Sequence, residues 1–160
     1  MSSFRSRSEY QQIADQLQLP SEAFIEGATV PAQSGETMET HNPATGTLLN
    51  RIASCDASDV DRAVDAAQRI FDSGEWSRMH PGDRKAILQR WVELIESHQE
   101  ELAVLESLDS GKPIRDCVTI DLPETMHTLT WYAEAADKLY GSVSPSGDDA
   151  MGVIYREPMG

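Results

Sequence analysis

The spacing of apolar residues changes once along the chain, from short alternating runs to a helical repeat. Between residues 24 and 53, the segments FIEG and GETMETHNPATGTLLNRIA place apolar residues between turn residues, which predicts strands joined by tight turns. Gly27, the pair Asn42-Pro43 and the pair Thr45-Gly46 supply the turn chemistry. We therefore expect short antiparallel strands at the start of the folded region.

A helical repeat begins after Asp56. In DASDVDRAVDAAQRIFDSG the apolar residues recur at the spacing of one helix face, at Val60, Val64, Ala67 and Phe71. Asp56 is a favourable N-cap, Asp59 falls at the third helical position, and Gly74 suits the C-terminal end. These signals predict an amphipathic helix between Asp56 and Gly74.

Two further helices and a final strand are predicted. One helix begins at Pro81 and continues without interruption until Gly111 and Pro113 end it. The next begins near Pro123 and ends at Gly141, and DDAMGVIYREPMG has the composition of a strand. Three amphipathic helices need a sheet to cover, and these few strands do not complete such a layer. We expect the chain to be the opening third of a larger α/β protein.

Composition and charge narrow the range of partners. The chain has 27 Asp and Glu against 13 Lys and Arg, a formal net charge of −14, and a surface of this sign repels nucleic-acid phosphates. No apolar run approaches the roughly 20 residues that span a bilayer, so no membrane partner is expected.

Residues 1–22 have no apolar segment of the secretory type and are interpreted as an exposed leader with a short helix over 10–17. The expected location is the cytoplasm.

The two cysteines are candidates for a nucleophile, but the pattern does not favour either. Cys117 precedes His127 by ten residues, across a segment that contains a proline. A thiol attacks a carbonyl only with a base within hydrogen-bond reach and an oxyanion site, which this spacing does not provide. Cys55 lies at the predicted junction of strand and helix and has no base nearby in sequence. We interpret both as structural thiols, and we assign no catalytic residue to the chain.

A set of motifs in matched order resembles a known family. The segments HNPATGTLLNRIASCDASDVDRAVDAAQRIFDSGEWS, ELAVLESLDSGKPIRD, WYAEAADKLYG and REPMG are similar to the N-terminal part of the NAD(P)-dependent aldehyde dehydrogenases, from Phe24 to Gly160. The segments LDSGKPIRD and WYAEAADKLYG are most similar to those of the branch that acts on aminoaldehydes such as γ-glutamyl-γ-aminobutyraldehyde.

The resemblance implies an α/β fold and a division of the chain. It implies the N-terminal portion of the aldehyde dehydrogenase fold: a strand hairpin, three amphipathic helices covering a Rossmann-like sheet, and the start of an oligomerisation hairpin. Residues 23–141 would belong to the cofactor-binding domain and residues 142–160 to the oligomerisation region. The catalytic residues and the residues that bind NAD or NADP are expected beyond Gly160, so this chain alone is expected to be inactive. The intact protein is expected to be a homodimer or homotetramer.

The resemblance also implies two sites that this chain shares with the absent region. A monovalent cation would be held by a backbone oxygen at His41 and by the carboxylate of Asp109. The substrate entrance would include Asp121 and Glu124, which attract the ammonium group of an aminoaldehyde, with Ile120 as apolar wall. Their spacing of three residues places both carboxylates on one face of a helix that starts there. Acids that favour the positive end of a helix dipole are the structural alternative.

A function of a different class is also compatible with the composition. A small acidic helical module that binds a partner and needs no cofactor would have the same charge and the same helical stripes. The two hypotheses differ in whether a nucleotide-binding region continues the fold.

Overall fold

The structure is a computed structural model that describes residues 4–159. Within them, the strands form separate two-stranded antiparallel sheets rather than one continuous layer. Strand β1 (Ala23–Ile25) pairs with β2 (Ala28–Val30), and β3 (Thr37–His41) pairs with β4 (Leu48–Ala53). The turn between β1 and β2 contains Glu26 and Gly27, both with positive φ, as a tight two-residue hairpin requires. The predicted hairpins at the start of the fold are confirmed.

Helix α2 (Ala57–Ser73) begins and ends at the predicted residues. The carboxylate of Asp56 accepts a hydrogen bond from the Ser58 amide at 2.8 Å, and Gly74 closes the helix in the left-handed region at φ 74°. Asp59 is only 2% exposed, and its carboxylate accepts from the amides of Gln33 at 3.0 Å and Asp56 at 3.2 Å. Asp59 therefore connects the helix start to the loop that follows β2.

The helix predicted from Pro81 to Gly111 is divided in two. Helix α3 (Pro81–Ser97) and helix α4 (Gln99–Ser110) meet at His98, whose backbone leaves the helical region at φ −112° and ψ 16°. The hydroxyl of Ser97 donates to the Leu94 carbonyl at 2.8 Å, so a side chain satisfies one of the carbonyls at the end of α3. Gly111 ends α4 at φ 73°, as predicted.

The last helical region begins earlier and ends earlier than predicted. Helix α5 (Ile114–Asp116) runs through a π-helical turn, η1 (Cys117–Asp121), into α6 (Leu122–Ala135). The wider π turn ends at Asp121, two residues before Pro123, whose ring would clash with a carbonyl in a regular helix interior. After Ala135 the amides of Ala136 and Lys138 bond three residues back, which tightens and ends the helix before Gly141.

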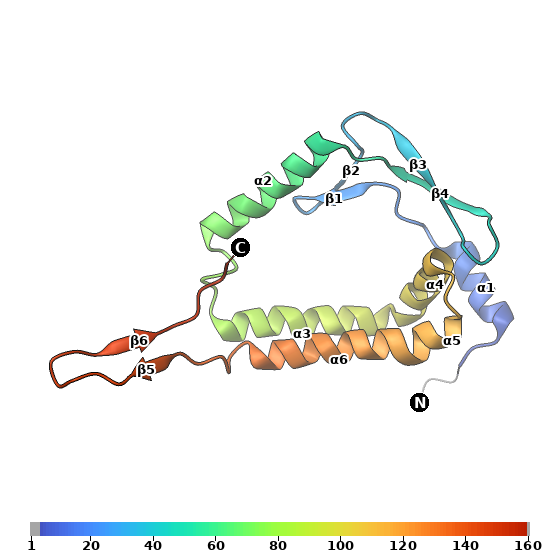
Figure 1. Cartoon of the computed structure of the whole chain (residues 1–160). Helices are drawn as coiled ribbons and strands as arrows, with labels where there is room; N and C mark the ends of the chain where they lie inside the picture. Colours follow the sequence, from blue (N-terminus) through green and yellow to red (C-terminus); the bar gives the residue numbers. More distant parts are fainter. Residues whose placement is uncertain (1–3, 160) are drawn as a thin grey trace.

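Helices α3 and α6 lie side by side (Figure 1), and an ion pair joins them. The ammonium of Lys85 donates to the Glu134 carboxylate at 2.9 Å, and Gln89 donates to the same group at 3.2 Å. The hydrogen bond from Lys85, aided by Lys138, lowers the pKa of Glu134. Ala133 is completely buried beside this contact.

The segment interpreted as an exposed leader packs against the rest of the chain. Helix α1 (Arg7–Gln16) is capped by Ser6, and Tyr10 on this helix is 7% exposed. The guanidinium of Arg5 donates to Glu100 of α4 at 2.8 Å. Most other described residues of this segment are exposed, as expected, but α1 has a fixed position against α4.

The C-terminal strand pairs within the chain. Strand β5 (Ser142–Ser144) and strand β6 (Gly152–Ile154) form a hairpin that projects from the end of the α3–α6 pair (Figure 1). The sequence predicts a single strand in this region, and the structure pairs it with a second strand, β5. No helix among residues 4–159 is long and apolar enough to cross a membrane.

Most of the predicted apolar stripe of α2 is exposed, and Phe71 at its end is half-buried. Val60 is 57% exposed and Val64 is 59% exposed, while Asp59 and Ala66 are the buried residues of this helix. Large apolar side chains are also exposed on α3 and on the hairpin, at Ile87, Trp91, Val143, Val153 and Ile154. The helices and the β5–β6 hairpin therefore keep apolar faces that the described residues do not cover.

We predict that Asp59→Ala lowers the free energy of unfolding by about 1–3 kcal/mol, because two amides lose their acceptor. Exposed Asp61→Ala, which removes an acid from the same end of α2, is the matched control and should change it by less than about 0.5 kcal/mol. Urea denaturation followed by circular dichroism measures both. Equal effects of the two substitutions would contradict the anchoring role.

Candidate functional site

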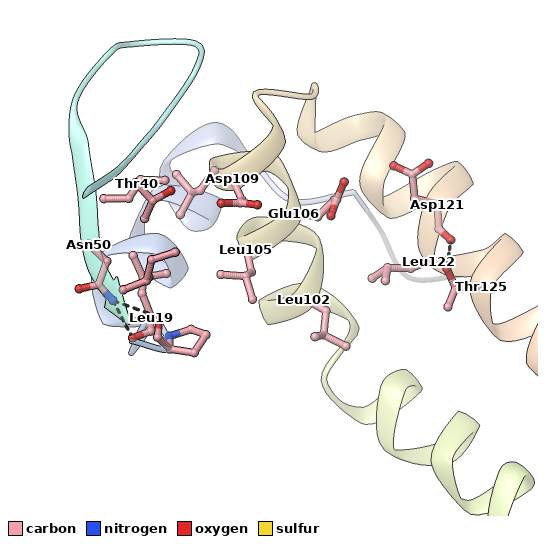
Figure 2. Close-up of a pocket in the computed structure, with 14 residues that line it drawn as sticks. Leu19, Thr40, Asn50, Leu102, Leu105, Glu106, Asp109, Asp121, Leu122 and Thr125 are labelled. Carbon is pink, nitrogen blue, oxygen red and sulfur yellow. Dashed lines mark hydrogen bonds between the residues drawn. The ribbon is translucent and has the colours of Figure 1, made fainter. Parts of the chain in front are cut away.

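A cavity of about 590 Å³ lies between α4, the start of α6 and the β3–β4 hairpin (Figure 2). Apolar side chains form much of its wall, among them Leu102, Leu105 and Leu122. On one side, the Asn50 side-chain amide donates to the carbonyls of Leu19 and Pro20 at 3.1 and 3.2 Å and so fixes the residues before β1 against β4. The cavity therefore joins segments that are far apart in sequence.

Three carboxylates line this cavity, and its lining residues include no basic side chain. Glu106 and Asp109 come from α4, and Asp121 comes from the end of the π-helical turn (Figure 2). The backbone carbonyl of Asp121 accepts a hydrogen bond from the Thr125 hydroxyl at 2.8 Å, which steadies the join between η1 and α6. The cavity therefore has a largely apolar wall that also carries three carboxylates.

The carboxylate of Asp121 is paired with Lys112. The Lys112 ammonium lies 2.6 Å from both oxygens of this carboxylate, and the Asp121 side chain is only 27% exposed. The hydrogen bond to Asp121 raises the pKa of Lys112. Because Lys112 is positively charged at neutral pH, it balances the negative charge of Asp121.

Asp121 and Glu124, which were expected to share one helix face, differ in their exposure and in their partners. Glu124 is exposed and, within residues 4–159, has no hydrogen-bond or ion-pair partner. Ile120, four residues before Glu124, is 53% exposed. Ile120 and Glu124 are therefore both open to solvent, whereas Asp121 is held by Lys112.

The two residues expected to hold a cation lie at neighbouring segments. The pairing of β3 with β4 is irregular between Thr40 and His41, and such a bulge leaves one residue out of the regular ladder. Thr40 and Asp109 line the same cavity, and Gly111 packs so closely on Pro43 that an added Cβ would lie 3.2 Å from its Cβ. The imidazole of His41 itself points to Glu39, at 3.5 Å.

The carboxylate of Asp109 and a backbone carbonyl at His41 are the kinds of oxygen that hard monovalent cations prefer. Among the described residues, no group of three or more His, Cys, Asp or Glu side chains is arranged to hold a metal ion. A site that combines Asp109 with a backbone oxygen at His41 is of a different kind and remains a prediction.

Cys117, the first residue of the π-helical turn, is completely buried. Burial raises the pKa of its thiol, and the carboxylates of Asp121 and Glu106 raise it further against a smaller opposite effect of Lys112. A protonated, inaccessible thiol is a poor nucleophile. Cys55 and His127 are exposed. This environment supports the interpretation of Cys117 as a structural residue.

Sequence reasoning missed Lys112 and Glu106 as parts of this site. Lys112 lies between Gly111 and Pro113, which the sequence assigns to a helix end, and its partner is nine residues away across α5 and η1. No regular helical or strand spacing predicts a contact at that separation, so the π turn hid the signal.

Comparison with known proteins agrees with this fold and these motifs. The model of the "Aldehyde dehydrogenase family" matches residues 29–160. The aminoacetaldehyde dehydrogenase of Pseudomonas aeruginosa is 52% identical over 160 residues, which are 100% of this chain and 32% of that protein. The NADP/NAD-dependent aldehyde dehydrogenase PuuC of Escherichia coli is 41% identical over 157 residues, covering 98% of this chain and 32% of that protein.

The fold has a close match among solved structures. The structure of the indole-3-acetaldehyde dehydrogenase AldA of P. syringae with NAD⁺ and IAA matches with a TM-score of 0.95 and 45% identity, over 98% of this chain and 32% of that chain. The chain thus spans about a third of the length of the relatives it matches. The expected fold class is confirmed, and this chain belongs to the aldehyde dehydrogenase family, where it matches the N-terminal part of its relatives.

Proposed function

We propose that the protein containing this chain oxidises an aldehyde to a carboxylic acid with NAD⁺ or NADP⁺, and that its substrate is an ω-aminoaldehyde or γ-glutamyl-aminobutyraldehyde. The observation that carries the proposal is the family match over residues 29–160 together with 52% identity to an aminoacetaldehyde dehydrogenase. In this reaction the aldehyde carbon loses a hydride and gains an oxygen from water. The nicotinamide, when bound, is the hydride acceptor.

In the proposed reaction this chain supplies scaffold and part of the substrate entrance, and it supplies no catalytic group. Neither cysteine is assigned as the nucleophile, because Cys117 is buried and Cys55 has no base assigned to it. Residues 23–141 contribute helices to the cofactor-binding domain, and the apolar stripe of α2 is the face that packs on its sheet. The chain alone is therefore expected to be inactive.

The outer face of the α6 start is proposed as part of the substrate entrance. Exposed Glu124 supplies a carboxylate to a substrate ammonium group, and Ile120 beside it supplies apolar wall. A hydrogen bond between charged groups contributes about 1.5–3 kcal/mol when the site is shielded from water. Glu124 is the better candidate of the two acids, since Asp121 is already paired with Lys112.

Two further parts of the proposal concern ions and assembly. Asp109 and a backbone oxygen at His41 would hold Na⁺ or K⁺, which would fasten the end of α4 to the turn after β3. The β5–β6 hairpin has exposed edges and exposed apolar residues, including Val153 and Ile154, and an open strand edge is a template for another chain. We propose that residues 142–160 contribute to a homodimer or homotetramer.

The thiol environment gives a direct test of the structural role of Cys117. In the native protein at pH 8, iodoacetamide should leave Cys117 unmodified, because its thiol is buried and its raised pKa keeps it protonated. Exposed Cys55 is the internal control in the isolated chain. Mass spectrometry after labelling in 6 M urea, a roughly denaturing concentration, should find both thiols modified. Native labelling of Cys117 at the rate of Cys55 would contradict this placement.

The aminoaldehyde proposal predicts a substrate-dependent effect of Glu124→Gln. In the intact enzyme this substitution should lower kcat/KM for an ω-aminoaldehyde about tenfold or more, and leave a neutral aldehyde of equal length within about twofold. Asp65→Asn, at an exposed acid of α2, is the matched control and should change neither. Equal losses on both substrates would remove Glu124 from ammonium recognition, and a wild-type protein that oxidises no aldehyde would refute the proposed activity.

A further inference from the structure

The ion pair between Lys112 and Asp121 balances the charge of one carboxylate beside the proposed substrate entrance. Lys112 does not line the cavity, yet its ammonium reaches both oxygens of Asp121 at 2.6 Å. The next basic residue along the chain, Arg115, is bound to Asp116 at 3.0 Å. Lys112 is thus the cation that offsets the charge of Asp121.

We propose that Lys112 determines substrate specificity by masking Asp121, so that Glu124 is the single carboxylate of the α6 start that meets a substrate ammonium group. The inference rests on the proposed aminoaldehyde oxidation. Asp121 directly follows Ile120, so an unmasked Asp121 would add a second negative charge beside the same entrance. Lys112 acts on the substrate only through Asp121 and is in this sense a positioning residue.

The exposure of the pair favours a role in charge over a role in stability. The Lys112 side chain is 41% exposed and that of Asp121 is 27% exposed. Ion pairs of such exposure contribute little to the free energy of folding, because water and salt screen them. Their charges still set the local potential, which acts on a charged ligand that approaches the entrance. Removing Lys112 should therefore leave the fold intact and alter the choice of substrate.

The test is a double-mutant cycle on the intact enzyme. The quantity measured is the specificity ratio, which is kcat/KM for an ω-aminoaldehyde divided by kcat/KM for a neutral aldehyde of equal length. A general loss of folded or active enzyme cancels in this ratio, so a merely structural role does not move it. Lys112→Met removes the charge, Lys112→Arg keeps it, and Lys112→Gln is a second variant without the charge.

Lys112→Met should raise the specificity ratio about three- to tenfold, since Asp121 is then free to attract the ammonium group. Lys112→Arg should keep the wild-type ratio. Asp121→Asn leaves Lys112 unpaired and should lower the ratio, because a like charge then faces the substrate. The double variant Lys112→Met with Asp121→Asn should return the ratio to within about twofold of the wild type.

Two results would overturn the masking role. An unchanged or lowered ratio in both Lys112→Met and Lys112→Gln would show that Asp121 is not masked. A double variant with a ratio several-fold below the wild type would show that Asp121 binds the ammonium group directly. Failure of the proposed function is distinguishable from these results, because a wild type without aldehyde oxidation refutes that function irrespective of the Lys112 variants. A Glu124→Gln variant with an unchanged ratio removes only Glu124 from ammonium recognition.

Discussion

The organisation of this chain depends on apolar helix faces that residues 4–159 do not cover. The buried apolar residues are few and mostly small, with Ala66, Ala103 and Ala133 among them, whereas Val60, Val64 and Trp91 remain more than half exposed. A helix in a globular protein is stabilised mainly by packing of its apolar face. The arrangement in Figure 1 therefore makes physical sense as a scaffold for a larger fold, in agreement with relatives about three times as long.

Polar and close backbone contacts at the ends of helices and strands position the side chains proposed to act in the site. Asp59 connects the start of α2 to the loop after β2, and Gly111 brings the end of α4 onto the turn at Pro43. The π-helical turn then carries the chain from α5 into α6 and places Asp121 within reach of Lys112. The proposed entrance thus depends on a backbone conformation that is already formed without substrate.

The sequence predicts those parts of the structure whose causes are local. Asp56 and Gly74 mark the ends of α2, because a cap acts within a few residues of itself. The break at His98 escapes prediction since the apolar stripe continues through it. Spacing of three residues brings Asp121 and Glu124 only to within about 60° around a helix, which is too coarse to decide which of them meets Lys112. The ion pair is a tertiary contact across the π turn, so periodicity alone could not identify it.

Hydrogen–deuterium exchange of α2 tests the central claim most directly. The amides of residues 57–73 should be compared between the isolated 160-residue chain and the proposed full-length protein that contains it. If the exposed stripe at Val60 and Val64 packs on the rest of the family fold, exchange in the full-length protein should be slower by about tenfold or more, because covering the stripe raises the free energy of local opening. Equal exchange rates in the two proteins would contradict this account.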